Sequence, residues 1–379
     1  MNPADILVVG VGGGGSRVVD RLADGIAHGP AFAVVDTDAR TVASVSVPAR
    51  LQAGAVVTDG LGAGGDIERG RRALEEDVEK VRNLVAGKSL VIIVACLGGG
   101  TGSSGAGVVS RAAQETGAVT LCFATQPFSF EGAARGSAAQ KAAAAIDDAV
   151  DILVLVPNDR LTEATGSVKL NDAFDRANRV LTSGIAAMWK LLTQPGYINI
   201  GLADVRQAAG RAGGCGFGYA EGEGDGKAAR VVEELLASPL LGGGAALERA
   251  GSLLVSIVGG PDMTLQDVGT VMDAISSRAP GHPNISMGTV LDEAWQNRLG
   301  ILVLHSSAAR RTGASSSAPS PPGGKGRRGR RARKATHTQI DLRFDSDAKG
   351  RFRNVEPTIL DGEDLDIPTF LRRGIEIEK

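Results

Sequence analysis

The stretch Gly98-Gly-Gly-Thr-Gly-Ser-Ser-Gly-Ala-Gly107 directly follows an apolar run, Leu90–Leu97. A second glycine-rich stretch, Gly10-Val-Gly-Gly-Gly-Gly-Ser16, follows the apolar run Ile6–Val9 in the same way. A strand that passes through consecutive glycines into a helix directs free backbone N–H groups and the positive end of the helix at one point. Such a point binds anions. Two of them in one chain predict a ligand with an extended, highly charged phosphate chain.

Short apolar runs alternate with longer helical patterns in the first part of the chain. The runs are apolar at consecutive positions, which is typical of strands buried on both faces of a parallel sheet. They are Ile6–Val9, Ala31–Val35, Leu90–Leu97, Val119–Ala124 and Ile152–Val156. The helices expected between them are Arg17–Ile26, Ile67–Val85, Val108–Thr116 and Ala133–Val150. This order predicts a doubly wound α/β domain, whose ligands bind at the carboxyl ends of the strands, where both glycine stretches lie.

A different pattern follows after Val156. A long helical pattern, Asp172–Leu192, ends at Pro195-Gly196. Beyond it, helices are expected at Lys227–Ala237 and Leu265–Ser277, and strands at Ser252–Val258 and Gly300–Leu304. We therefore expect a doubly wound parallel-sheet domain over residues 1–170, a long central helix over 171–195 and a smaller α+β C-terminal domain over 196–310.

The composition changes abruptly at Ala308. Ser315–Gly324 is rich in Ser, Pro and Gly, and a run of basic residues follows it. Such sequences cannot bury a core, so we predict a disordered basic linker over 311–340 and a tail over 341–379. The basic run either binds anionic lipid or nucleic acid by charge alone or is a solvated linker. Its cations are Lys325, Arg327, Arg328, Arg330, Arg331, Arg333 and Lys334.

The bulk composition narrows the class of protein. The 379 residues carry a net charge of −2, which favours neither nucleic acid nor membrane as a partner of the whole chain, and aromatic residues make up only 3%. Cys96, Cys122 and Cys215 are widely spaced and match neither a metal site nor a disulfide framework, as in a reducing cytosol. No apolar run approaches the ~20 residues of a membrane span, and the first strand leaves no room for a signal peptide. We expect a cytoplasmic protein.

The first glycine stretch alone suggests a dinucleotide fold. Gly10, Gly12 and Gly15 match G-x-G-x-x-G, and Asp36 ends the next strand, where a ribose-binding acid belongs. That reading, an NAD-dependent oxidoreductase, does not explain the second stretch, which is either a flexible turn or a second phosphate loop. Neither stretch continues to the Gly-Lys-Ser/Thr of a Walker A loop. The phosphate charge must then be met by backbone N–H groups, helix ends and a metal ion.

Gly98-Gly-Gly-Thr-Gly-Ser103 resembles the signature of the tubulin/FtsZ superfamily of filament-forming GTPases, and the FtsZ branch is the closer match. Further segments occur in family order along nearly the whole chain: Gly12–Gly15, Asp36-Thr-Asp38, Gly60–Gly64, Gly70-Arg-Arg72, Pro127–Gly132, Pro157–Arg160 and Asp172-Ala-Phe174. The resemblance implies that residues 1–170 bind GTP or GDP with Mg²⁺. It also implies that the protein polymerises head to tail with itself.

The resemblance further implies which residues hold the nucleotide. Those around the phosphates are Gly12, Gly13, Gly14, Gly15, Ser16, Arg17, Gly98, Gly99, Gly100, Thr101, Gly102 and Ser103, and those in the loop near the γ-phosphate are Ala63 and Gly64. Glu131 and Arg135 would face the ribose. Phe174 would stack on guanine, and Asn178 would read the edge of the base. These two residues are four apart and share one helix face, although periodicity alone favours core packing for Phe174.

The family places its catalytic carboxylates in a loop after the central helix, where they act on GTP held by the next subunit. The family pattern Asn-x-Asp-x-x-Asp reads Asn199-Ile-Gly-Leu-Ala-Asp204 here, so Asn199 and Asp204 are the expected catalytic residues. Gly201 replaces an aspartate that would help to hold the metal and orient water. Such a loss commonly costs ~10²–10³ in rate. We predict GTP binding with slow hydrolysis; the alternative is a GTP-binding filament scaffold with little or no hydrolysis.

Two further departures from the family pattern lie in the phosphate loops. Ser16-Arg17 stands where family members usually carry Gly or Asn, and Arg17 either adds a cation near the phosphates or points to solvent. Ser104 replaces a glycine of the signature. This replacement matters only if the position needs a positive φ.

The last segment carries a candidate partner-binding peptide, 363–373. Asp366 can cap a short helix there, and Ile367, Phe370 and Leu371 have the i, i+3, i+4 spacing of one apolar stripe. The peptide resembles the C-terminal peptide of FtsZ. The resemblance implies docking on membrane-tethering or regulatory division proteins through Asp364, Ile367, Phe370 and Leu371. It also implies recruitment to the division site at the inner face of the membrane.

Overall fold

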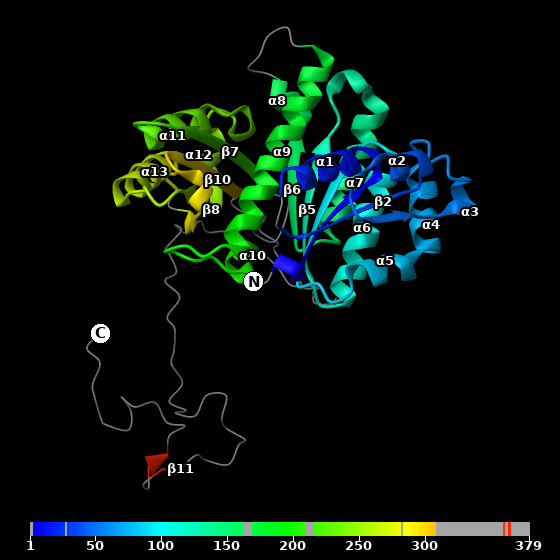
Figure 1. The fold of residues 1–379 in the computed structure, drawn as a ribbon, viewed down its shortest axis with the longest axis horizontal. Coiled ribbons are helices and arrows are strands. Elements are labelled where there is room, and N and C mark those ends of the chain that lie inside the picture. Colours follow the sequence, from blue (N-terminus) through cyan, green and yellow to red (C-terminus); the bar gives the residue numbers. More distant parts are fainter. Residues whose placement is uncertain are drawn as a thin grey trace, which may run out of the picture. The chain divides into compact units, whose positions relative to one another are not determined.

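The computed structural model describes residues 3–26, 29–162, 169–209, 215–281, 283–307, 359–360 and 363–364. The chain divides into two compact units, Met1–Thr312 and Gly313–Lys379. Within the described part of the first unit, helices surround a 10-stranded sheet of order β3-β2-β1-β4-β5-β6-β7-β10-β8-β9 (Figure 1).

The first half of this sheet is parallel. Its strands, in spatial order, are β3 (Ala49–Gln52), β2 (Ala31–Asp36), β1 (Ile6–Val11), β4 (Leu90–Cys96), β5 (Val119–Gln126) and β6 (Ile152–Pro157). The parallel, doubly wound arrangement that the apolar runs predicted is confirmed. The sequence did not reveal β3, because this edge strand is short and none of its residues is fully buried.

Helices cover both faces of the parallel strands, which explains why the strands are apolar at every position. Ile6 and Val8 of β1 join the core beneath α1 (Gly12–Asp24) and α9 (Leu170–Thr193). Leu7 and Val9 join the opposite core. That core is covered by α4 (Ile67–Glu76), α5 (Val78–Val85), α6 (Gly100–Glu115) and α7 (Ala133–Asp147). The shorter helices of this half are η1 (Pro3–Asp5), α2 (Ala39–Ser44), α3 (Ala55–Thr58), η2 (Ser129–Glu131) and α8 (Asn158–Thr162).

Two predictions about these helices were wrong. The single helix expected over Ile67–Val85 is broken at Asp77, whose Oδ2 accepts a hydrogen bond from the Gly54 amide at 2.8 Å. This tertiary contact overrides the continuous helical periodicity. The helices expected to begin at Arg17 and Val108 begin instead at Gly12 and Gly100, inside the glycine stretches. The low helix propensity of glycine conceals these starts, because close packing there requires residues without a side chain.

The central helix α9 is confirmed over Leu170–Thr193. Its 24 residues make it about 36 Å long. Leu181, Ile185, Met188 and Leu192 lie on one buried stripe of this helix. Because α9 contacts both α1 and the strands β7 to β10, it links the two halves of the unit.

The second half of the unit carries the antiparallel part of the sheet. Its elements are α10 (Leu202–Ala209), β7 (Cys215–Glu223), α11 (Lys227–Ala237), η3 (Pro239–Leu241), α12 (Ala245–Glu248), β8 (Ala250–Gly259), α13 (Leu265–Ser277), β9 (Asn284–Leu291), η4 (Glu293–Trp295) and β10 (Arg298–Ser307). Strand β10 pairs antiparallel with β7 and β8, while β8 pairs parallel with β9. The α11 and α13 predictions are confirmed. The sequence analysis did not predict β7, β9 or α10, because glycine and polar residues interrupt the two strands and α10 is only 8 residues long.

The two halves of the sheet meet at the seam between β6 and β7. Among the described residues, these strands share one residue pair, Val154–Cys215. The apolar core beneath α9 continues past this seam, since it contains Phe123 and Val154 on one side and Phe217 and Leu254 on the other. The mixed α/β architecture predicted from the sequence is confirmed.

The second unit contributes β11 (Ile359–Leu360) and β12 (Glu363–Asp364), which pair antiparallel. The expected basic linker and the apolar stripe of the tail peptide lie outside the described residues. No helix in the described ranges is long and apolar enough to cross a membrane.

Candidate functional site

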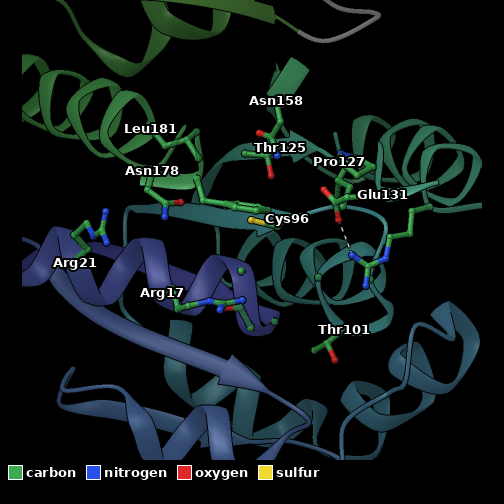
Figure 2. A pocket seen from close by; sticks show the side chains of 18 of the residues that line it. Arg17, Arg21, Cys96, Thr101, Thr125, Pro127, Glu131, Asn158, Asn178 and Leu181 are labelled. Carbon is green, nitrogen blue, oxygen red and sulfur yellow. Dashed lines mark hydrogen bonds and ion pairs between the residues drawn. The ribbon is translucent and has the colours of Figure 1, made fainter. Parts of the chain in front are cut away.

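A cavity of about 660 Å³ opens at the carboxyl ends of the parallel strands (Figure 2). Its volume falls in the range of sites for small ligands. The predicted site residues that line it are Gly12, Gly13, Gly14, Arg17, Gly99, Gly100, Thr101, Gly102, Glu131, Arg135, Phe174 and Asn178. The fold therefore brings together residues from both glycine stretches and from the central helix.

The glycines allow two helix N-termini to meet at this cavity. Gly12 has a φ of 73°, and a Cβ there would lie 2.7 Å from the Gly102 amide nitrogen. Only glycine permits that conformation and that approach. The residues before α1 and α6, Val11 and Gly99, provide no side-chain cap. The first N–H groups of both helices therefore remain available to a ligand, together with the positive helix ends.

Six predicted phosphate-site residues do not line the cavity: Gly15, Ser16, Ala63, Gly64, Gly98 and Ser103. Two of them, Gly15 and Ser103, instead hold the glycine stretches in place against the rest of the domain. A Cβ on Gly15 would lie 2.1 Å from the Val94 carbonyl oxygen, so α1 rests directly on β4. Ser103 Oγ accepts a hydrogen bond from the Gly98 amide at 2.9 Å, which fixes the start of the second loop. Ser16 is fully buried, and within the described ranges its Oγ has no partner.

Ala63 and Gly64 belong to a loop that packs beside the second glycine stretch. A Cβ on Gly100 would lie 2.7 Å from the Ala63 Cβ, which shows how closely the loop approaches α6. Gly64 has a φ of 62° and nothing within 4 Å of a Cβ placed on it. This loop supports the start of α6 from outside the cavity.

Glu131 and Arg135 form an ion pair of 2.6 Å at one end of the cavity (Figure 2). The other oxygen of Glu131 accepts a hydrogen bond from the Phe128 amide at 2.9 Å. Both carboxylate oxygens are therefore engaged, and the pair is held in place by the turn that precedes α7.

Phe174 lies at the cavity rather than in the core, with 39% of its surface exposed. Phe128 contacts it edge to face, with ring centroids 5.2 Å apart. Phe128 in turn stacks on Phe130 at 4.9 Å. Asn178 lies one turn further along α9 and also lines the cavity. The structure thus places an aromatic ring and an amide on the same side of the cavity.

Several lining residues were not predicted: Arg21, Cys96, Leu97, Thr125, Pro127, Asn158, Asn171, Asp175 and Leu181. Helical spacing could have found some of them. Asn171 and Asp175 share a face with Phe174 and Asn178, and Arg21 lies four residues after Arg17. Asn158 lies in the family segment Pro157–Arg160, whereas Cys96 and Thr125 lie at the ends of strands where no local pattern marks them.

Arg17 is exposed and lines the cavity, and its Nε donates to the Gly13 carbonyl at 3.1 Å. The guanidinium therefore lies at the mouth, both near the phosphate loops and open to solvent. Ser104 lies inside α6, where its Oγ donates to the Gly100 carbonyl at 2.9 Å. Its φ is not positive, so the replaced glycine is not required at this position.

Hydrogen bonds connect the second glycine stretch with the residues at the end of β2. Thr101 Oγ1 and Thr37 Oγ1 share a hydrogen bond of 2.7 Å. The buried Asp36 carboxylate accepts a hydrogen bond from the Thr37 amide at 2.7 Å, and burial raises its pKa above the ordinary value. In the described ranges, no group of three or more His, Cys, Asp or Glu residues can hold a metal ion.

The expected catalytic residues lie at the other end of the central helix (Figure 1). Asn199 Oδ1 accepts a hydrogen bond from the Gly196 amide at 3.1 Å, and Asp204 Oδ2 accepts one from the Gly201 amide at 2.8 Å. The part of α9 between Phe174 and Thr193 spans about 28 Å. The cavity and Asp204 of one chain therefore cannot act on the same ligand.

Fold and cavity define a doubly wound α/β protein built to hold an anionic ligand between two helix N-termini. Residues 5–166 match the GTPase domain of the tubulin/FtsZ family, and residues 213–308 match the C-terminal domain of the FtsZ family. The cell division protein FtsZ of Magnetospirillum gryphiswaldense is 36% identical over 318 residues, which cover 83% of this chain but 56% of that protein. FtsZ 1 of Halobacterium salinarum is 35% identical over 79% of this chain and 75% of its own length.

Solved structures agree with this assignment. An empty FtsZ dimer from M. jannaschii has a TM-score of 0.74 at 30% identity and covers 82% of this chain and 89% of its own. A GTPγS-bound CetZ2 protofilament from Haloferax volcanii has a TM-score of 0.67 at 23% identity, covers 80% and 93%, and shows the shared fold. The chain belongs to the tubulin/FtsZ family, in its FtsZ branch. This membership confirms the resemblance and removes the dinucleotide-oxidoreductase alternative.

Proposed function

We propose that this protein is a cytoskeletal GTPase that binds GTP in the cavity and polymerises head to tail into filaments for cell division. The observation that carries the proposal is the separation of the cavity from Asn199 and Asp204 along α9. A site split between two ends of one chain is complete only where two copies meet end to end. The relatives described above are cell division proteins, which supports the same role here.

The cavity offers what a nucleoside triphosphate requires. The first N–H groups of α1 and α6, which the N-cap side chains do not cap, suit the phosphates, and Arg17 adds a positive charge at the mouth. Phe174 supplies an aromatic face for the base, and Asn178 supplies an amide for its edge. Glu131 lies at the opposite end from Asn178, on the side proposed for the ribose (Figure 2).

Mg²⁺ fits this donor set as an ion held mainly by phosphate oxygens and water. Such ions need only one or two protein oxygens, and the Thr101 hydroxyl lies in the cavity wall. When bound, the ion neutralises charge that develops on the transferred phosphoryl group. The protein residues position the phosphates around it.

Exposed apolar side chains support an end-to-end contact between copies. Tyr197 and Ile198 precede Asn199 and are 81% and 42% exposed. On the loops around the cavity, Leu61 and Phe130 are 71% and 64% exposed. Exposed apolar groups at both ends suit burial against another copy. In that contact, Asn199 and Asp204 of one copy would reach the GTP of the next.

Hydrolysis is proposed to be slow because Gly201 carries no carboxylate. A Cβ at this position would lie 3.7 Å from Asp204 Oδ2, which is ordinary van der Waals contact, so an aspartate can be accommodated. Phosphate release and sedimentation should be compared for the wild type and Gly201→Asp with GTP, GDP and no nucleotide. We expect the variant to release phosphate about 10²-fold faster. Gly281→Asp, an exposed position with open space, is the charge-matched control.

The outcomes of this experiment separate two functions. Wild-type polymer with phosphate release supports the GTPase. Stable wild-type polymer with almost no release supports a nucleotide-binding scaffold, which the missing carboxylate at Gly201 favours. Equal rates in the wild type and Gly201→Asp would refute the role assigned to Gly201. The absence of polymer under all conditions would refute the filament.

The tail is proposed to recruit the filament to the division site at the inner face of the membrane. Its peptide, with Asp364, Ile367, Phe370 and Leu371, would dock on a tethering or regulatory protein. The basic cluster Lys325–Lys334 would add salt-sensitive binding to anionic lipid or nucleic acid. Binding to anionic vesicles and to DNA, with and without residues 325–334 and at two salt concentrations, tests this. Unchanged binding would leave the cluster as a solvated linker.

A further inference from the structure

The cavity wall contains a carboxylate that the phosphate chemistry does not use, Asp175. We infer that Asp175, oriented by Arg21, reads the amino edge of guanine and sets the purine specificity of this site. The inference rests on the proposed binding of a guanine nucleotide and names the residue that selects the base.

Asp175 and Arg21 join the two helices that enclose one end of the cavity. Asp175 Oδ1 accepts a hydrogen bond from Arg21 Nη2 at 2.9 Å, and both side chains line the cavity. Asp175 belongs to α9, directly after Phe174 and three residues before Asn178, while Arg21 belongs to α1. Figure 2 shows Arg21 and Asn178 at the end of the cavity away from Glu131. The pair therefore lies where the base is proposed to bind.

The ion pair has little value as a purely structural contact. Its side chains are 49% and 44% exposed, and pairs of this kind contribute only ~0–1 kcal/mol to stability. Asp175 Oδ2 accepts no hydrogen bond from any described residue. Among the described lining residues, the other carboxylate is Glu131, whose two oxygens are engaged by Arg135 and the Phe128 amide. Asp175 is thus the lining carboxylate with an acceptor left for a ligand.

Guanine presents the hydrogen-bond groups that this end of the cavity can satisfy. Its N1–H and N2–H₂ donors lie side by side and match the two oxygens of a carboxylate, while its O6 accepts from an amide or a guanidinium. Asn178 and Arg21 provide such donors beside Asp175. Adenine presents an acceptor at N1 instead, so its lone pair would face the carboxylate. A site that leaves a polar group unpaired with the wrong base discriminates strongly.

The inference is tested with the full-length protein and xanthosine diphosphate. Xanthine carries a carbonyl where guanine carries N2–H₂, so a carboxylate repels it and an amide nitrogen donates to it. We expect Asp175→Asn to weaken GDP binding about 10–100-fold and to strengthen xanthosine diphosphate binding by a similar factor. Isothermal titration calorimetry with each nucleotide measures both changes. An unchanged ratio of the two affinities would overturn the inference.

Two control variants separate base reading from other effects. Asp172→Asn makes the same chemical change on an exposed residue of α9 that does not line the cavity, and it should leave both affinities unchanged. Arg21→Gln breaks the ion pair but keeps the carboxylate, so GDP should remain preferred over xanthosine diphosphate. If Arg21→Gln switches the preference as strongly as Asp175→Asn, the carboxylate does not read the base and the inference fails.

A measurement on the wild type needs no variant to fold. Inosine diphosphate lacks only the exocyclic amine of GDP, so its binding should be about 10-fold weaker. Equal affinities would show that the amine is not read. If the wild type binds no guanine nucleotide at all, the proposed function fails together with the inference. If it binds GDP and inosine diphosphate equally, the inference alone fails.

Discussion

Gly13 and Gly15 stand two positions apart in one glycine stretch, yet their surroundings differ. A Cβ on Gly13 would meet nothing closer than 3.7 Å, whereas a Cβ on Gly15 would lie 2.1 Å from the Val94 carbonyl oxygen. Gly13 lines the cavity and Gly15 rests on β4. Gly13 therefore leaves space for a ligand, whereas Gly15 allows α1 to pack against the sheet.

These two roles predict opposite results for alanine. Gly15→Ala should lower the free energy of unfolding by about 3 kcal/mol, because the new Cβ meets a backbone carbonyl and can be accommodated only if α1 shifts away from β4. Gly13→Ala, the matched control in the same turn, should change it by less than about 1 kcal/mol. Chemical denaturation without nucleotide measures both. Equal stabilities of the two variants would contradict the packing shown by the structure.

His305 predicts a pH dependence of stability. Burial lowers its pKa from 6.5 to about 4, and within the described ranges its Nε2 has no hydrogen-bond partner. The unfolded chain then binds a proton between pH 6.5 and 4 that the folded chain does not, so stability falls as the pH falls through this window. The loss amounts to at most about 3 kcal/mol.

His305→Met isolates this contribution, since methionine is neutral at every pH. Denaturation curves between pH 7 and 4.5 should fall more steeply for the wild type than for the variant. Parallel curves would show that His305 does not titrate as its burial requires. Acidic groups elsewhere act on both proteins equally, so the difference between the curves is the relevant quantity.

Among the elements, α9 contacts the second half of the unit through a small cluster of charged side chains around Trp295: Lys190, Asp292 and Arg298. Lys190 pairs with Asp292 at 2.7 Å, with side chains 17% and 16% exposed. The Lys190 ammonium also lies 4.5 Å from the ring centre of Trp295, and Arg298 lies on the same ring at 4.6 Å. Because the charges of Lys190 and Asp292 are largely shielded from water, the cluster should matter more than a surface pair.

Lys190→Met keeps the aliphatic stem but removes the ammonium that pairs with Asp292 Oδ2, which leaves the carboxylate with the Ala294 amide as its hydrogen-bond donor. We expect a loss of about 2 kcal/mol in the free energy of unfolding. Lys80→Met makes the same replacement in a pair of equal length, 2.7 Å, whose lysine is 61% exposed. That control should lose less than about 1 kcal/mol. Similar losses in both variants would mean that the cluster does not fasten α9.

The elements also show what the sequence could and could not predict. Consecutive apolar positions predicted β1, β2, β4, β5 and β6, because a strand that is buried on both faces is apolar at successive positions. Amphipathic spacing predicted α9, α11 and α13. It failed at Asp77, where one hydrogen bond from Gly54 ends a helix, and at Gly12 and Gly100, where helices begin in glycine.

The cavity was predictable only where its residues lie in a recognisable local pattern. The glycine stretches were found in that way, whereas Phe174 and Asn178 were found only through the resemblance to the tubulin/FtsZ superfamily; all of them reach or adjoin the cavity. Helical spacing could have placed Arg21 and Asp175 at the cavity, but it could not predict their ion pair, which joins residues 154 positions apart. Such pairs depend on how α1 packs against α9, which no single segment encodes.

At the scale of the whole molecule, the split site predicts that two inactive variants restore activity together. Asp204→Ala would bind GTP but offer no carboxylate, and Phe174→Ala with Asn178→Ala would offer Asp204 but hold no nucleotide. In a random equal mixture, about a quarter of the contacts combine an intact cavity with an intact Asp204. Phosphate release should therefore rise to about a quarter of the wild-type rate. Activity no higher than that of the separate variants would contradict a shared site.

The seam between β6 and β7 has a mechanical consequence. Among the described residues, these strands share one pair, Val154–Cys215, whereas β7 and β10 pair from Arg298–Glu223 to Ser306–Cys215. Helix α9 contacts elements of both halves, and the apolar core beneath it continues across the junction. We expect the two halves of a subunit to tilt about this junction under load, while α9 keeps its length. We expect bending strain in a curved filament to concentrate at this seam.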